Sequence, residues 1–395
     1  MMDWLRRHKF ALLLAVVVAA YYPRFARQAF TLYPLGGQAL LQGQPLEAVA
    51  PGFTYPPFFA FCMIPFTWLP VGLRTPLWYA VMVGSIIACF RVCERLCVTG
   101  EWTPRELGWL RGLTLLLSLK VTLAVFENQA YDSVVFLLIL VGLRELLKAH
   151  PLNSAMGLGA STALKATPLL FFPYLLLRGR LKMLVLGLVF FAGFSFLPDL
   201  LFTPRDGASG YFVTWMRTIA GSAMQTGATS GEPTTLRQWQ QLNPLNQSLR
   251  SVVYQWTIGG SYEPHTKTVL YTVYLAYLLV VGTLLVWPRG AARSVALDGS
   301  LVLISMLMLS PMSSKSHFVV LMLPYMLTGS YVIREPRFRW VGGTFLGLSF
   351  ALITLTSRDL IGKTLSDLCL SAGCVVYGTL ALLAALGYII LKQKP

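Results

Sequence analysis

Long apolar runs recur along the whole chain and constrain its fold more than any other feature of the sequence. Candidate membrane spans lie at 9–22, 56–71, 76–95, 108–126, 133–148, 155–177, 182–202, 267–287, 296–312, 318–333, 340–356 and 371–391. Many of them approach the ~20 residues that an α-helix needs to cross a bilayer. Charged residues make up 12% of the chain, against about 25% in ordinary soluble domains. Because helices satisfy their own backbone hydrogen bonds in lipid, the sequence predicts an all-α polytopic membrane protein.

The chain shows no internal repeat and no low-complexity linker, so we expect one integral membrane domain over residues 1–395. Two long polar stretches, 22–55 and 203–265, are expected to be outer loops. In the first, apolar residues recur at helical spacing from Phe30 to Leu46, which predicts short helices lying on the membrane surface. The apolar run at 9–22 ends without a small-residue cleavage site, so it is expected to be an uncleaved first helix.

The net charge of +16 comes from 32 Lys and Arg against 16 Asp and Glu. No hydrophilic domain is present to bind nucleic acid, so we assign this charge to basic cytoplasmic loops and to contacts with membrane lipids. Cys89, Cys93 and Cys97 recur along one helical face. Neither His nor a carboxylate completes a metal-ligand set there, and we expect buried cysteines, with no metal site and no cofactor.

Basic residues that flank the runs favour the cytoplasm, but twelve straight crossings would place Arg144 and Lys148 outside. Two adjustments remove this conflict. The proline-rich run 56–71 is expected to be a surface or re-entrant element. The run 155–177 carries Lys165 at its middle, where a charge is costly in lipid, so it is expected to be a hairpin of two short helices that turns near the outer face.

With these adjustments, four polar clusters are expected to lie together on the outer face, the first of them within the first loop itself. They are the 29–43 and 55–57 stretch, Glu127–Asp132, Ala163–Pro168 and Ser310–His317, with Asn246-Gln247-Ser248 as a possible fifth. Structural roles are open for each: Lys165 can extend to the interface, His317 can cap a helix, and Glu127 and Asp132 can be solvated turn residues or charges at a helix N-terminus.

The order of these clusters resembles glycosyltransferase family 87, which includes polyprenol-phosphate-mannose-dependent mannosyltransferases. The family pattern is Asp-Phe-x-x-Tyr, a Gly/Leu-rich helix, Tyr-Pro-Pro, Gly-Gln-x-Asn, Ala-Leu-Lys-x-x-Pro, Asn-Gln-Ser, and Ser-Pro-x-Ser ending in His. The resemblance extends from about residue 28 to 330. It implies a GT-C-type bundle of about 11–12 transmembrane helices, with the active site under the first outer loop. It also implies transfer of a hexose, by analogy mannose, from a polyprenyl-phosphate donor to a lipid or glycan acceptor.

Residue by residue, the resemblance places Phe30 and Tyr33 on Asp-Phe-x-x-Tyr and Gln129 on Gly-Gln-x-Asn. It places Lys165 on Ala-Leu-Lys-x-x-Pro and His317 on the terminal His. Asn246, Gln247 and Ser248 match directly, whereas Tyr131 replaces the family's Asn. It implies substrate-binding roles for Tyr33, Gln129, Lys165, Asn246 and Gln247, and we expect Lys315 to bind substrate as well. A leaving phosphate needs cations or hydrogen-bond donors, which Lys165, Lys315 and His317 can supply.

One departure concerns the catalytic base. The family's acidic residue before Phe30 is Ala29 here, although a carboxylate is expected to take the proton of the acceptor hydroxyl. Another carboxylate can serve, the activity can be altered, the site can be degenerate, or position 29 can have been changed deliberately. Glu127 and Asp132 are favoured over Glu47 because they lie in a polar cluster.

Three functions stay open at this point. The first is a membrane glycosyltransferase with its active site facing the periplasm or cell exterior from the cytoplasmic membrane. The second is a lipid-linked-sugar transporter or flippase, although repeated halves are not found. The third is a catalytically altered relative, which Ala29 favours.

Overall fold

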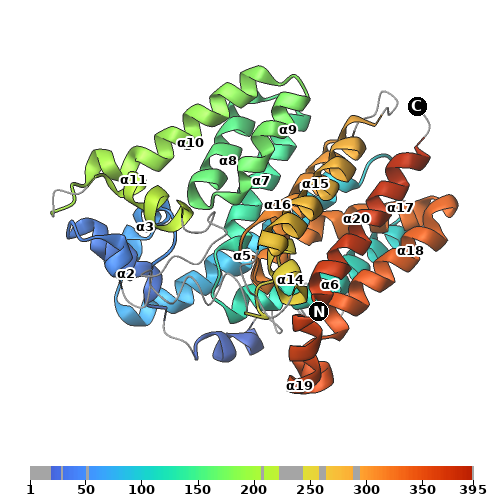
Figure 1. Cartoon of the computed structure of the whole chain (residues 1–395), viewed down its shortest axis with the longest axis horizontal. Helices are drawn as coiled ribbons and strands as arrows, with labels where there is room; N and C mark the ends of the chain where they lie inside the picture. Colours follow the sequence, from blue (N-terminus) through green and yellow to red (C-terminus); the bar gives the residue numbers. More distant parts are fainter. Residues whose placement is uncertain are drawn as a thin grey trace, which may run out of the picture.

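The computed structural model describes residues 19–27, 30–49, 53–205, 209–221, 243–257, 264–287 and 294–393. Within these ranges the chain is helical, with short connections and no strand (Figure 1). This confirms the predicted all-α class. Most of the predicted first helix, 9–22, lies outside the described residues.

The helices divide into short elements near the chain start and long ones that form the bundle. In chain order they are α2 (Leu32–Leu41), η1 (Leu46–Ala48), α3 (Pro57–Cys62), α4 (Ile64–Thr67), α5 (Val71–Cys97), α6 (Pro104–Glu127), α7 (Asp132–Leu147), α8 (Pro151–Leu164), η2 (Thr167–Leu170), α9 (Phe171–Leu177), α10 (Leu181–Leu201), α11 (Tyr211–Trp215), η3 (Met216–Ala220), α14 (Leu249–Trp256), α15 (Pro264–Val286), α16 (Val295–Leu309), η5 (Lys315–Leu321), α17 (Met322–Arg334), α18 (Pro336–Phe350), η6 (Ala351–Leu355), α19 (Arg358–Ser371) and α20 (Cys374–Lys392).

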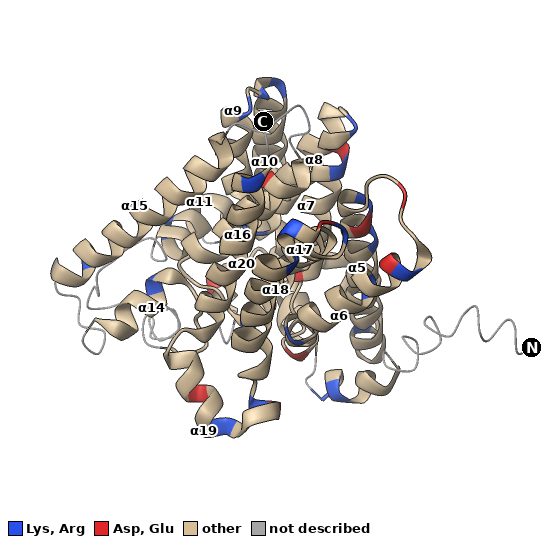
Figure 2. Cartoon of the chain, turned by 90° about the vertical axis from the view of Figure 1, so that its right-hand side faces the viewer, with Lys and Arg blue, Asp and Glu red and all other residues tan. Residues whose placement is uncertain are grey.

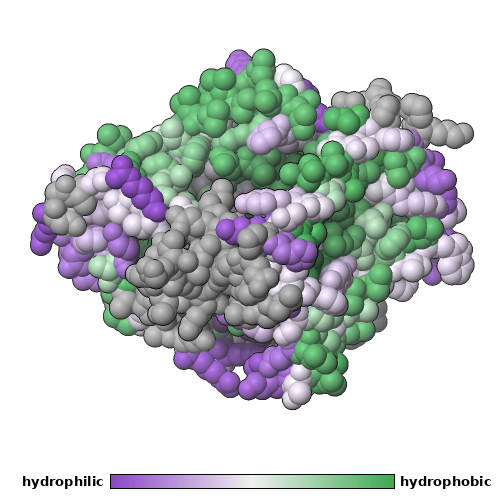
Figure 3. Space-filling model, viewed as in Figure 1, coloured by the Kyte–Doolittle hydropathy of each residue, from purple (hydrophilic) through white to green (hydrophobic). Residues whose placement is uncertain are grey.

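Seven of the described helical segments are long and apolar enough to cross a membrane. Their burial differs with their place in the bundle: 17% of the apolar window of α10 is buried, against 78% for the segment Lys315–Arg334. The outward side chains of α10 and α15 are mostly aliphatic, and a surface of this kind suits lipid. In Figure 3 hydrophobic surface lies between two polar edges, one near α2 and α11 and the other near α18. The structure is therefore that of a polytopic membrane protein.

The predicted interruptions of the bundle are confirmed at both places. The run 56–71 forms two short helices, α3 and α4, instead of one continuous helix. The run 155–177 is split at Lys165, whose extended backbone ends α8 before η2 and α9 carry the chain back. The first loop contains α2 and η1, as its apolar spacing predicts.

Glycines let α8 pack closely between two neighbours, and this packing positions Lys165. A Cβ on Gly157 would lie 2.9 Å from the Leu138 carbonyl oxygen of α7, and one on Gly159 would lie 2.6 Å from the Phe190 Cβ of α10. The Ser154 hydroxyl donates to the Gly142 carbonyl of α7 at 2.7 Å. Small residues and short polar contacts are typical of helix interfaces in membranes.

Helices that alternate in direction give the bundle two distinct ends. We call the end that carries Glu127, Asp132 and Lys165 the site end. The opposite end, the basic end, carries the helix ends with Arg95, Arg144, Lys148, Arg178, Arg334 and Lys392. Figure 2 looks onto the right-hand side of Figure 1 and shows several Lys and Arg residues near α17 and α18. The predicted basic flanks that lie among the described residues are thus grouped at one end.

One basic residue at this end is not a solvated flank. The Arg178 guanidinium bonds Asp298 of α16 (Nη2 to Oδ2, 2.7 Å) and donates to the Leu285 carbonyl at 2.7 Å. Both side chains are largely buried. Removing one partner of a buried pair leaves a charge without compensation, so this contact ties α9, α15 and α16 together.

The close α7–α8 packing yields a stability prediction. Gly157→Val places side-chain atoms against backbone of α7 that cannot move aside, and overpacking of this kind costs about 1–3 kcal/mol. We expect a lower thermal unfolding midpoint for the detergent-purified variant. Gly193→Val is the matched control, because a Cβ at Gly193 of α10 meets nothing within 4 Å. Equal midpoints for the two variants would contradict the packing argument.

Candidate active site

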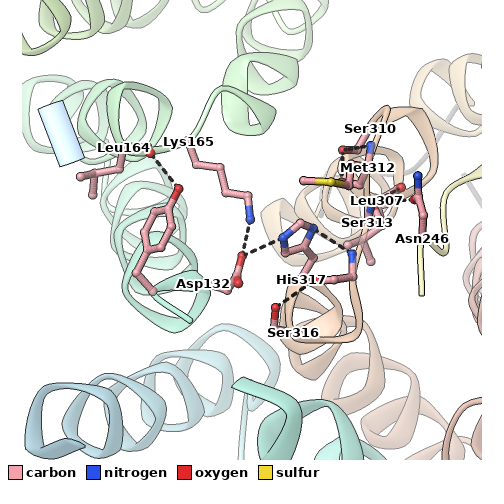
Figure 4. A network of polar contacts seen from close by, with 12 residues as sticks. Asp132, Leu164, Lys165, Asn246, Leu307, Ser310, Met312, Ser313, Ser316 and His317 are labelled. Carbon is pink, nitrogen blue, oxygen red and sulfur yellow. Dashed lines mark hydrogen bonds and ion pairs between the residues drawn. The ribbon is translucent and has the colours of Figure 1, made fainter. Parts of the chain in front are cut away.

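Asp132 is the centre of the candidate site. It is the first residue of α7, and its side chain is 6% exposed. The Lys165 ammonium, at the turn that follows α8, forms an ion pair with its carboxylate (Figure 4). The carboxylate also accepts a hydrogen bond from the Ser316 side chain. Burying a carboxylate is costly unless it is paired and hydrogen-bonded, and here both conditions are met.

His317 reaches the same carboxylate from η5. Its Nε2 lies 3.8 Å from Asp132 Oδ1, while its Nδ1 accepts from the Ser314 backbone N–H at 3.3 Å. The second contact belongs to a capping box at the start of η5. Helix capping and a place in the site are therefore compatible for His317, because they use different ring nitrogens.

These groups line a small pocket with a cavity volume of about 20 Å³. Charged and polar side chains share its lining with apolar ones: Asp132, Lys165, Thr167, Ser310, Ser313 and His317, with Val135, Met306, Leu307 and Val320. The pocket thus presents one carboxylate, one ammonium and one imidazole within an apolar bundle. Proton transfer and stabilisation of an anion are the chemistry that this set can perform.

Aromatic rings connect the first loop to the site. Tyr33 of α2 contacts Tyr55 and Tyr131, with ring centroids 5.2 and 6.1 Å apart. Phe30 stacks on Trp78 of α5 at 5.1 Å. Burial raises the pKa of the Tyr33 hydroxyl well above its usual range, so this group stays protonated. The predicted convergence of Tyr33 with the Asp132 cluster is present in the structure.

Tyr131 sets the geometry of Lys165. Its hydroxyl donates to the Leu164 carbonyl at the end of α8 (3.1 Å), and its ring lies 5.7 Å from the Lys165 ammonium. Because the carbonyls of a last helical turn need partners, this bond fixes the point where α8 stops. Ser316 is a neighbour of the site that the sequence did not single out, and Tyr131 was noted only as a departure from the family motif. Their positions next to Asp132 and His317 were the available signal.

Glu127 and Lys315 do not join the pocket. Glu127 ends α6 and pairs with Arg24 at 3.1 Å, with 30% of its side chain exposed. Lys315 makes no hydrogen bond or ion pair with the residues that the structure describes, and it does not line the pocket. Nearby, Lys120 pairs with Asp359 of α19 at 2.9 Å. These charges form a rim at the site end, apart from the Asp132 cluster.

The predicted substrate-binding amides hold the protein's own backbone. The Asn246 side chain accepts from the Ser313 N–H (3.0 Å) and donates to the Pro311 carbonyl (3.1 Å). Gln247 donates to the Leu370 carbonyl at 2.9 Å. These contacts join the segment before α14 to the segment before η5, next to His317.

Gln129 has a similar structural role. Its side-chain amide donates to the Phe25 carbonyl at 3.1 Å, and its own carbonyl accepts from the Trp78 indole at 2.9 Å. Its backbone is left-handed, with φ of 48°. The conformation turns the chain between α6 and α7 and so directs Asp132 into the bundle.

Ala29, at the family's base position, lies outside the described residues. Among the residues described, no group of three or more His, Cys, Asp or Glu side chains is arranged to hold a metal ion.

Two known proteins are similar to this chain. A polyprenol-phosphate-mannose-dependent alpha-(1-2)-phosphatidylinositol mannoside mannosyltransferase of Mycolicibacterium smegmatis is 32% identical over 165 residues, which cover 37% of this chain and 38% of the relative. The matched part is thus well under half of that protein. The crystal structure of ArnT from Cupriavidus metallidurans bound to undecaprenyl phosphate aligns with 97% of this chain and 78% of its own, at 12% identity and a TM-score of 0.41.

The sequence profile of glycosyltransferase family 87 matches residues 53–311. This range contains Asp132, Lys165 and Asn246, whereas Ala29 and His317 lie outside it. Because the match covers more than half of the 395 residues, this chain belongs to glycosyltransferase family 87.

Proposed function

We propose that this protein transfers a hexose, specifically mannose, from a polyprenyl-phosphate donor to a lipid or glycan acceptor at the outer face of the cytoplasmic membrane. One observation carries the proposal: Asp132, Lys165 and His317 come from distant parts of the chain and meet in one pocket at the site end. Family membership supplies the reaction class, and the mannose donor is taken from the name of the mycobacterial relative.

The reaction assigns a role to each of the three side chains. The acceptor hydroxyl oxygen attacks the anomeric carbon, and its proton passes to the Asp132 carboxylate as general base. The bond from the anomeric carbon to the phosphate oxygen breaks, and its electron pair leaves with the polyprenyl phosphate. Lys165 and His317 stabilise the charge that develops on that phosphate.

The ion pair of Asp132 with Lys165 couples these roles. In the structure Lys165 holds the carboxylate, which lowers its readiness to take a proton. A donor phosphate carries negative charge and competes for the same ammonium. When Lys165 also donates hydrogen bonds to the phosphate, it interacts less with the Asp132 carboxylate. The carboxylate is then a stronger base while the donor is bound.

Charge distribution supports the outward direction of the site. Loops rich in Lys and Arg are retained in the cytoplasm, and the basic end lies opposite the Asp132 pocket. The pocket then opens on the outer side, where a polyprenyl-phosphate sugar that has crossed the membrane is available.

The direct test is sugar transfer by the purified protein in lipid nanodiscs. The assay supplies radiolabelled polyprenyl-phosphate mannose with an extract of membrane lipids as acceptor, and the glucosyl donor in a parallel reaction. A new labelled glycolipid from the mannosyl donor supports the proposal, and a product from the glucosyl donor alone overturns the choice of sugar. Movement of the donor across liposomes with no new glycosidic bond would instead favour the transporter.

The position of the base can be tested by paired substitutions. Asp132→Asn keeps the shape of the side chain and removes the proton acceptor, so we expect turnover to fall by roughly 10²–10⁴-fold. Glu127→Gln is the matched control, with the same chemical change at the same end, and is expected to keep near wild-type turnover. Thermal midpoints check that both variants fold. Full activity of Asp132→Asn, or a large gain in Ala29→Asp, would place the base elsewhere.

Lys165 is expected to act on the donor. Lys165→Met retains an apolar stem and removes the charge, and we expect a loss of about 10²-fold in kcat/KM for the donor. Lys182→Met, at the basic end, serves as the control. Donor saturation curves measure the effect, and unchanged curves for Lys165→Met would leave this lysine with a structural role only.

A further inference from the structure

The junction between α19 and α20 brings two cysteines together. Gly373 has a left-handed backbone, with φ of 80°, and its N–H donates to the Leu370 carbonyl at 3.0 Å. Ala372 is the C-cap of α19. When a helix ends in this way, the side chain three residues before the C-cap lies beside the side chain two residues after it. Those two positions are Cys369 and Cys374.

The two thiols are in contact. Their side chains are close enough to interact, and both residues are partly exposed. Gly373, between them, packs closely against α14, because a Cβ at this position would lie 2.7 Å from the Val252 side chain. Of the four remaining cysteines, Cys89, Cys93 and Cys97 are buried along α5, and Cys62 at the end of α3 is partly exposed but has no cysteine beside it in the chain.

The pair lies at the site end of the bundle. Asp359 near the start of α19 pairs with Lys120 at 2.9 Å, and the Leu370 carbonyl accepts from Gln247. From Cys374, α20 runs to the basic end, where the Lys392 carbonyl accepts from Arg337 at 3.3 Å. If the basic end is cytoplasmic, as the proposed function has it, the two cysteines face an oxidising compartment, where disulfides form and persist.

We propose that Cys369 and Cys374 form a disulfide bond in the membrane-inserted protein. The inference rests on the orientation given in the proposed function. The oxidant is a disulfide-bearing thiol oxidase of the outer compartment. One cysteine thiolate attacks the oxidant's disulfide, and the second attacks the resulting mixed disulfide. The pair gives up two electrons and two protons, and the oxidant leaves as a dithiol.

The bond would support the site through the backbone. It would close the turn between α19 and α20 and fix the Leu370 carbonyl, which accepts the hydrogen bond of Gln247. The adjacent Asn246 holds the Pro311 and Ser313 backbone beside His317. The disulfide is therefore a positioning device at a distance from the reacting groups.

Differential alkylation tests the proposal on the full chain. The protein is expressed in a bacterial host with an intact extracytoplasmic thiol-oxidation system, and its membranes are denatured in N-ethylmaleimide without reductant. Trypsin cleaves after Lys363 and Lys392, so both cysteines lie in one peptide, 364–392. We expect this peptide to lack maleimide and to be two hydrogens lighter than the dithiol. After reduction it should take up two maleimides.

The chain contains its own controls. Cys89, Cys93 and Cys97 should be alkylated without reductant, and Cys369→Ser should leave Cys374 with one maleimide. Two maleimides on unreduced wild-type peptide 364–392 would overturn the disulfide. This readout does not depend on sugar transfer: a reduced pair in an active enzyme rejects the disulfide alone, and an oxidised pair in an inactive protein rejects only the proposed reaction.

Discussion

The ion pair of Asp132 with Lys165 is the contact on which the site end is built. A charge placed alone inside an apolar bundle carries a large desolvation cost, which a partner and further hydrogen bonds must offset. Asp132 can be buried at the start of α7 only because α8 stops at Leu164 and delivers Lys165 beside it. The stop is reinforced by the Tyr131 hydroxyl, and the approach of α8 depends on Gly157 and Gly159. Packing of the helices and chemistry of the pocket therefore follow from the same residues.

Much of this arrangement was predictable from the sequence, because the free-energy cost of placing polar residues in lipid restricts where they can lie. Lys165 in the middle of an apolar run was incompatible with a straight helix, and the run is indeed a hairpin. The basic flanks fixed the direction of most helices, and the prolines of 56–71 indicated the break between α3 and α4. These inferences rest on the free energy of placing a residue at a given depth in the bilayer. This free energy depends on the residue type, so the local sequence is sufficient to predict it.

Side-chain direction was not predictable in the same way. Glu127 and Asp132 are five residues apart, yet a left-handed Gln129 separates them, and one pairs with Arg24 at the rim while the other is buried against Lys165. Asn246 and Gln247 match a family motif, but their amides hold backbone carbonyls of distant segments. Such roles depend on which neighbour the tertiary fold brings within hydrogen-bonding distance, and a motif does not encode that neighbour by itself.

The alanine at position 29 and the ion pair of Asp132 with Lys165 both bear on the cost of burying a carboxylate in this bundle. A permanently free carboxylate beside the acceptor would be costly to bury in this bundle, and it would repel the phosphate of the incoming donor. A carboxylate that is neutralised by Lys165 removes both problems while the pocket is empty. In the proposed reaction the donor phosphate would enter a site in which the Lys165 ammonium and the His317 imidazole both face the Asp132 carboxylate. On the proposed mechanism the donor itself would release the base, and an acidic residue in the first loop would not be required to activate the acceptor.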